Sequence, residues 1–91
     1  MMKFEFDPKK SQSNFEKHGL TFEEAKALWN SKAVVLKARC TDEERFMMMG
    51  TIKGKIHSCI FTVRKDAIRL ISVRRSHEKE ERFYAQKIRN D

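Results

Sequence analysis

The first third of the chain carries patterns that predict one strand and two helices. Residues 3–6 alternate apolar with charged side chains, which indicates a half-exposed strand. Asp7 as N-cap and Pro8 in the first turn predict a helix from Pro8 to His18, which Gly19 ends in a left-handed conformation. This helix has little apolar surface, so we expect it at the protein surface.

A second helix begins at Thr21, where Glu24 completes the pattern of a capping box. Trp29 could stack on a nucleic-acid base or pack in the core, and its helical spacing from Phe22 favours the core. The expected buried stripe comprises Phe22, Ala25, Leu28 and Trp29, and the helix should end at Asn30 and Ser31.

From Lys32 onward the apolar period changes to two, which predicts a meander of four antiparallel strands. A final helix follows, and we expect Ser76 to cap it. The order β-α-α-β-β-β-β-α predicts one α+β domain over residues 1–91, a small antiparallel sheet with helices on one face. The strands are expected over residues 33–38, 45–53, 56–63 and 67–75, the turns at residues 41–44, 54 and 64–66, and the last apolar stripe at Phe83, Tyr84 and Ile88.

Positive charge is concentrated in the second half of this pattern. Twenty Lys and Arg against 13 Asp and Glu give a net charge of +7 and a pI near 9.7. Residues 51–75 hold seven Lys or Arg and one Asp, so seven minus one places +6 in one sheet-forming region. A balance of this kind favours nucleic acid or another polyanion as the partner.

Other signals narrow the class of protein. No apolar run reaches the roughly 20 residues of a membrane-spanning helix, and the first five residues lack a signal-peptide core, so we expect a cytoplasmic protein without membrane contact. Cys40 and Cys59 lie outside any C-x-x-C pattern and are interpreted as buried thiols. No phosphate-binding or dinucleotide glycine pattern and no histidine ligand spacing is present, so we expect neither a cofactor nor a metal site.

The predicted strand Ile68–Arg75 carries arginines within an apolar β-branched run. Guanidinium groups resist burial unless an anion meets them, and their fork matches phosphate oxygens. Regular alternation would place Arg69 and Arg74 on opposite faces of this strand. At the strand exit, Arg74 can turn towards Glu80 and Tyr84, which lie at i and i+4 on the following helix.

Arg45 begins another predicted strand, on the face that also carries Met47 and Met49. If that strand lies close to residues 68–75, two arginines would bracket one phosphate. Cleaving RNA requires a base for the 2′-hydroxyl, stabilisation of charge on the pentacovalent phosphate, and an acid for the leaving oxygen. From residue types alone, the simpler interpretation is a salt bridge between Arg74 and Glu80 that positions the last helix.

Several segments together resemble the BrnT toxin family of type II toxin–antitoxin systems. The patterns K-H-G-[L/I]-x-F and I-S-x-R-R, in this order and separation, are their most specific part, and the resemblance extends over nearly the whole chain. The matching residues are Phe4 to Lys10, Asn14, Lys17 to Glu23, Glu44, Arg45, Gly50, Ile68 to Arg75, Glu80 and Tyr84.

This resemblance implies a RelE-like fold and the toxin half of a toxin–antitoxin pair, an endoribonuclease that halts translation and growth by cutting RNA. We expect cleavage without a metal ion. The resemblance further implies a BrnA-like antitoxin that binds the toxin directly, in an assembly with two copies of each protein. Operator DNA would be bound only indirectly, through the antitoxin.

Carried over to this sequence, the resemblance implies that Arg45 and Arg74 act on the phosphate and the charge of the transition state. Glu80 would be a base or the residue that orients Arg74, and Lys17 and His18 would contact RNA or transfer protons. Further RNA contacts are expected at Arg69, Arg75, Lys53, Lys55 and Tyr84.

Two hypotheses from other classes remain open at this point. A non-catalytic nucleic-acid-binding domain would use its charge for phosphate contacts alone, with steeply salt-dependent binding and no scission. An interaction module would bind one acidic partner through the basic face and residues Met47–Met49, since methionine-rich surfaces adapt to partners. Strand alternation nevertheless predicts that this methionine run lies mostly in the core.

Overall fold

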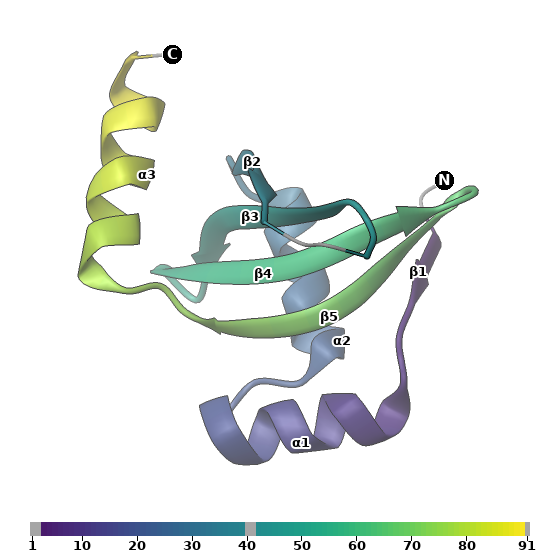
Figure 1. The fold of residues 1–91 in the computed structure, drawn as a ribbon. Coiled ribbons are helices and arrows are strands. Elements are labelled where there is room, and N and C mark those ends of the chain that lie inside the picture. Colours follow the sequence, from purple (N-terminus) through teal and green to yellow (C-terminus); the bar gives the residue numbers. More distant parts are fainter. Residues whose placement is uncertain (1–2, 40–41, 91) are drawn as a thin grey trace.

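The computed structural model describes residues 3–39 and 42–90 and confirms an α+β fold with the predicted order of elements (Figure 1). Cys40 and Thr41, at the start of a predicted turn, lie outside the described residues. The elements are β1 (Lys3–Glu5), α1 (Pro8–His18), α2 (Phe22–Ala25), the 3₁₀ helix η1 (Lys26–Asn30), β2 (Val34–Ala38), β3 (Arg45–Ile52), β4 (Lys55–Arg64), β5 (Ala67–Arg75) and α3 (Glu78–Asn90).

The helix boundaries in the first third follow from local hydrogen bonds. Asp7 accepts a hydrogen bond from the Lys9 amide at 2.9 Å, and Gly19 ends α1 with φ 74°. Thr21 and Glu24 form both halves of the predicted capping box. The second helix is shorter than predicted, because after Ala25 the chain tightens from α-helix to the 3₁₀ turns of η1.

The five strands form one sheet in the order β1-β5-β4-β3-β2. The meander from β2 to β5 is antiparallel as predicted, while β1 pairs in parallel with β5. A two-residue turn joins β3 to β4, with positive φ at both Lys53 (52°) and Gly54 (78°). This geometry matches the right-handed twist of a hairpin, so β3 ends at Ile52, one residue earlier than predicted.

The main core lies between one face of the sheet and the segments α2 and η1. Trp29 packs edge to face against Phe4 and Phe61, with ring centroids 5.1 Å apart in each pair, which confirms its predicted role in the core. Cys59 is a free thiol with no exposed surface, as predicted. The largest of the other fully buried side chains in this core are Phe22, Leu28 and Val73.

The helices do not all cover one face of the sheet, contrary to the prediction. In Figure 1, α3 stands at the left of the sheet and α1 runs beneath β5. Helix α3 packs over the opposite face, where it approaches β2 and β3 and covers Met49, which is only 1% exposed. We call this surface the α3 face. Within the described chain, no helix is long and apolar enough to span a membrane.

Asn14 joins α1 to the edge of β5 beyond the end of β1. Its side-chain amide donates hydrogen bonds of 2.8 Å to the carbonyls of Val73 and Leu20, and its side-chain oxygen accepts from the Val73 amide at 3.1 Å. The side chain therefore pairs with the backbone of β5 as a neighbouring strand would, which covers part of an exposed edge. Asn14 is only 6% exposed, whereas its apolar neighbour Phe15 is 47% exposed.

Candidate active site

A β-bulge in β5 decides which way its arginines point. Ile60 of β4 pairs with Ser72, but the next residue, Phe61, pairs with Leu70, so Ile71 has no counterpart on β4. An extra residue of this kind shifts the alternation of side chains by one position. Arg69 therefore points to the same face as Ser72 and Arg74. The prediction of opposite faces for Arg69 and Arg74 was wrong, because it assumed a regular strand.

Three arginines surround Ile60 on the α3 face. On β3, Ile60 pairs with Met47, and Arg45 lies two residues before Met47. On β5, Ile60 pairs with Ser72, and Arg74 lies two residues after Ser72. Arg69 pairs with Thr62, two residues after Ile60 on β4. Each arginine is thus a diagonal neighbour of Ile60, at about 7–8 Å between Cα atoms. Their side chains retain 28 to 37% exposure. We call Arg45, Arg69 and Arg74 the arginine cradle.

The register also corrects the expected relation between β3 and β5. The two strands are not adjacent, because β4 lies between them. Arg45 and Arg69 lie two strands apart, at about 10 Å. Arg45 and Arg69 therefore flank β4 from opposite sides of the same face. The Arg45 Nε donates to a Glu43 carboxylate oxygen at 3.2 Å, and Arg69 Nη1 lies 3.8 Å from a carboxylate oxygen of Glu5.

Arg74 and Glu80 meet in a two-pronged ion pair that joins the end of β5 to the first turn of α3. The two guanidinium Nη atoms each donate a hydrogen bond of 2.8 Å, one to each carboxylate oxygen of Glu80. Glu80 Oε1 also accepts hydrogen bonds from the His77 amide at 2.9 Å and from Ser58 Oγ at 3.1 Å. The pair holds the Arg74 guanidinium in a fixed plane on the α3 face.

These donors lower the pKa of Glu80 to about 2. The largest cause is hydrogen bonding by Arg74, opposed by burial and reinforced by the His77 amide. The same hydrogen bonding raises the pKa of Arg74. A carboxylate with so low a pKa is a poor proton acceptor at neutral pH, since a general base works best with a pKa near the working pH. The geometry therefore favours the second of the two roles considered for Glu80, the orientation of Arg74.

Two polar residues near this pair have structural contacts that the sequence did not predict. The Ser76 hydroxyl lies 2.7 Å from Ser58 Oγ in a buried pair, and α3 begins two residues later. Ser76 is thus not the cap, and Glu80 instead accepts from the His77 amide at the helix start. The Tyr84 hydroxyl donates to the Lys32 carbonyl at 2.6 Å, and the residue is 8% exposed. Tyr84 anchors α3 to the chain before β2, and its buried hydroxyl is not available to RNA.

Lys17 and His18 lie at the C-terminal end of α1, near the middle of β5. With Ser72 they line a shallow pocket of about 270 Å³. Ser72 lies two residues before Arg74 on β5, on the same face. The contact that Asn14 makes with β5 positions this end of α1, since Lys17 and His18 follow it by three and four residues. Asn14 is one of the residues that resemble the BrnT family, but no pattern in the sequence predicted its hydrogen bonds to β5.

The other predicted RNA contacts are more distant. Lys53 lies in the β3–β4 turn and Lys55 begins β4, at the end of β3 opposite Arg45, about 25 Å along the strand. Arg75 pairs with His57 and so points to the face opposite Arg74; its Nε lies 3.9 Å from a Glu81 carboxylate oxygen. The structure brings Arg45, Arg69 and Arg74 together and leaves these three cations outside the cradle.

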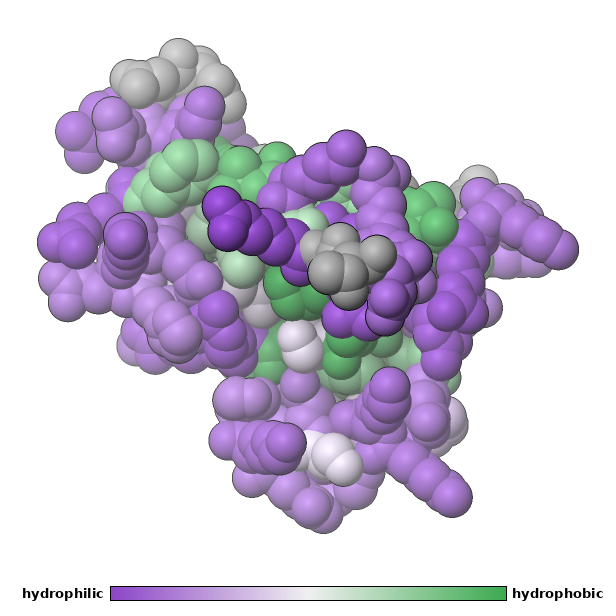
Figure 2. All heavy atoms as spheres, in the orientation of Figure 1, coloured by the Kyte–Doolittle hydropathy of each residue, from purple (hydrophilic) through white to green (hydrophobic). Residues whose placement is uncertain are grey.

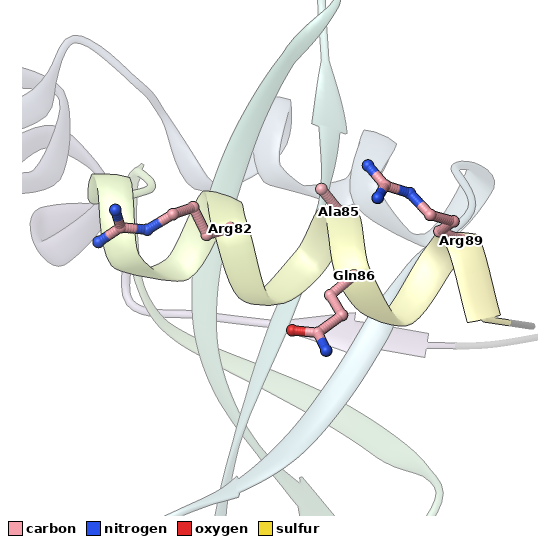
Figure 3. A pocket seen from close by; sticks show the side chains of 4 residues that line it. All are labelled: Arg82, Ala85, Gln86 and Arg89. Atoms are coloured by element: carbon pink, nitrogen blue, oxygen red, sulfur yellow. The ribbon is translucent and has the colours of Figure 1, made fainter.

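The molecular surface combines apolar and basic regions. Figure 2 shows apolar side chains in green gathered between the hydrophilic surfaces of α3 and α1. Figure 3 shows a second basic surface, with Arg82, Ala85, Gln86 and Arg89 along the exposed side of α3. Within residues 3–39 and 42–90, no group of three or more His, Cys, Asp or Glu side chains has a metal-binding arrangement.

Comparison with known families assigns the chain to a family of toxins. Residues 6–80 match the family described as the ribonuclease toxin BrnT of type II toxin–antitoxin systems. The chain belongs to the BrnT family. The matched segment includes the whole cradle and Glu80, whereas most of α3 follows it. A search of curated proteins found no match. The BrnT assignment confirms the resemblance seen in the sequence.

Proposed function

We propose that this BrnT-family protein is an endoribonuclease that cleaves RNA at a phosphate bound in the arginine cradle. The observation that carries the proposal is the placement of Arg45, Arg69 and Arg74 at equivalent diagonal positions around Ile60. Phosphoryl transfer places negative charge on the non-bridging oxygens, and preorganised cations stabilise that charge. A plain salt bridge between Arg74 and Glu80 would not require two further arginines on the same face of the sheet around Ile60.

The proposed reaction uses the 2′-hydroxyl of the RNA as nucleophile. The 2′-oxygen forms a bond to phosphorus as its proton passes to a base, and the bond to the 5′-oxygen breaks as that oxygen receives a proton. The products are a 2′,3′-cyclic phosphate and a 5′-hydroxyl end. Arg45, Arg69 and Arg74 stabilise the pentacovalent phosphate, while Glu80 fixes the plane of Arg74.

Lys17 and His18 are the candidates for proton transfer or for contacts to the RNA. They line the pocket that reaches Ser72, two residues before Arg74 on the same face of β5. Imidazole is the side chain most often used for general acid–base catalysis. No step of this scheme requires a metal ion, and we propose that cleavage is metal-independent.

The test is a cleavage assay with labelled single-stranded RNA in buffer containing EDTA. We expect products that end in a 2′,3′-cyclic phosphate, and no cleavage of the same sequence with 2′-O-methyl groups. If folded protein binds the RNA but leaves it intact with and without Mg²⁺, the protein is instead a binding domain. Steeply salt-dependent binding would accompany that result.

We further propose that a BrnA-like antitoxin binds this protein in the cytoplasm, as two copies of each chain, and that operator DNA is contacted by the antitoxin alone. The membership of a toxin–antitoxin family supports a partner. Co-purification with the product of the adjacent gene, followed by light scattering, should give the mass of a 2:2 complex and abolish cleavage. A purified partner that leaves cleavage unchanged would contradict this proposal.

A further inference from the structure

An apolar groove lies between α3 and the part of the sheet formed by β2 and β3. Its volume is about 300 Å³, and Leu36, Met47, Met49 and Phe83 supply its apolar lining. Lys79 and Glu80, from the first turn of α3, complete it. The prediction that the methionine run is mostly buried is confirmed, because Met48 and Met49 are buried while Met47 remains half-buried at the groove.

The groove is continuous with the arginine cradle at two points. Met47 pairs across the strands with Ile60, the residue at the centre of the cradle. Glu80 lines the groove and also holds the guanidinium of Arg74. Side chains opposite each other on neighbouring strands lie about 5 Å apart, so a phosphate above Ile60 lies next to the mouth of the groove. A nucleotide with its phosphate in the cradle can therefore extend its base into the groove.

The lining matches the chemistry of a nucleobase. Phe83 offers an aromatic ring for stacking, and the thioether of Met47 is polarizable and adapts to an aromatic face. Lys79 is exposed at the rim and carries only donors, so it can bond to acceptor atoms on the edge of the base. An apolar helix of a protein partner would need a groove that takes side chains from several successive turns. Four apolar side chains around about 300 Å³ suit one planar ring system better.

We propose that this groove is a nucleobase-binding site, in which a base of single-stranded RNA next to the bound phosphate stacks on Phe83. The proposal rests on the proposed function, because the cradle supplies the phosphate site that brings the base to the groove. It assigns a role in substrate choice to residues of α3 that lie beyond the segment matched by the family.

The test measures binding of short 2′-O-methyl RNA oligonucleotides by fluorescence anisotropy. One position at a time is made abasic, and each oligonucleotide is measured with wild-type protein and with Phe83→Leu. In wild type, we expect one abasic position to weaken binding by about 5-fold to about 100-fold, the range that base stacking on an aromatic side chain supplies. In Phe83→Leu this penalty should be largely lost, and Phe83→Tyr should restore it.

The matched control is Phe15→Leu, the same substitution at an exposed phenylalanine on α1. It should leave the abasic penalty unchanged, and circular dichroism should show that both variants are folded. If Phe83→Leu keeps the full penalty at every position, the groove does not hold a base, and a protein partner becomes the better occupant. If Arg74→Ala leaves cleavage intact, the cradle is not the site of cleavage and the proposed function is contradicted. That result is distinct from the abasic penalty, which is measured by binding alone.

Discussion

Replacement of Glu80 by glutamine removes the charge that orients Arg74 while keeping the size of the side chain. The pKa of Glu80 falls from 4.5 to about 2 in the folded protein, a shift that corresponds to roughly 3 kcal/mol of stabilisation at neutral pH. The side chains of Arg74 and Glu80 keep 28% and 20% exposure. With a discount for solvent screening, we expect Glu80→Gln to lower the free energy of unfolding by about 2 kcal/mol at pH 7.

The sign of the pH dependence follows from the lowered pKa. A carboxylate whose pKa is depressed by folding contributes its full stabilisation above the pKa of the unfolded state, and this contribution is lost as pH falls through the folded value. The difference between wild type and Glu80→Gln should therefore be constant above about pH 5 and shrink towards pH 2. Other carboxylates titrate in the same range, but they are common to both proteins and cancel in the difference.

Urea unfolding at a series of pH values from 2 to 8, followed by circular dichroism, measures this difference. A value below about 0.5 kcal/mol at pH 7, or one that does not change between pH 5 and pH 2, would refute the role given to the ion pair. The pH profile of RNA cleavage provides an independent check. If Glu80 orients Arg74, the variant is slower at every pH with the same profile, whereas loss of a general base would change the shape of the profile.

Three further predictions concern the scaffold of the site. Asn14→Ala leaves three backbone groups without their partner, so urea unfolding should show a loss of about 2–4 kcal/mol. A Cβ on Gly50 would lie 2.5 Å from Ser31 Oγ, so Gly50→Ala should cost about 1–3 kcal/mol, and Ser31→Ala should relieve part of that loss. Burial raises the pKa of the Cys59 thiol to about 12. In a Cys40→Ser background, a thiol reagent at pH 8 should therefore label Cys59 only in urea. Labelling of the folded protein would contradict this burial.

Much of the fold could be predicted because its signals are local. The cap at Asp7, the glycine that ends α1 and the capping box at Thr21 all involve residues within four positions of each other. The strands of the meander followed from apolar alternation and short turns. The switch from α-helix to 3₁₀ helix after Ala25 was not predictable, because both conformations place the same residues against the core.

The arrangement of the site depends on the β-bulge in β5, which a regular pattern of apolar and polar residues cannot reveal. Within β5 the buried residues Ile68, Leu70 and Val73 are spaced by two and then by three positions. This change of spacing is the sign of the bulge within β5. It cannot be recognised from the sequence, because Ile71 and Leu70 are both apolar and either could be the buried residue. A regular alternation of period two therefore assigned Arg69 and Arg74 to opposite faces.

Other contacts of the site join residues far apart in the chain. Tyr84 bonds to the carbonyl of Lys32, and Ser76 pairs with Ser58. Asn14 contacts a strand 59 residues later. Side chains of this kind satisfy backbone or hydroxyl partners that only the folded sheet brings into reach, so residue type and local spacing gave no sign of their roles.

Single-turnover cleavage of RNA by Arg69→Ala tests the central claim most directly, because only the bulge places Arg69 in the cradle. We expect a loss of at least about 100-fold, similar to that of Arg45→Ala and Arg74→Ala, as for other preorganised groups that stabilise charge in a transition state. The matched control is Arg82→Ala, which removes an arginine from the exposed side of α3 and should keep the wild-type rate. Wild-type cleavage by Arg69→Ala, with Arg74→Ala inactive, would contradict a three-arginine cradle.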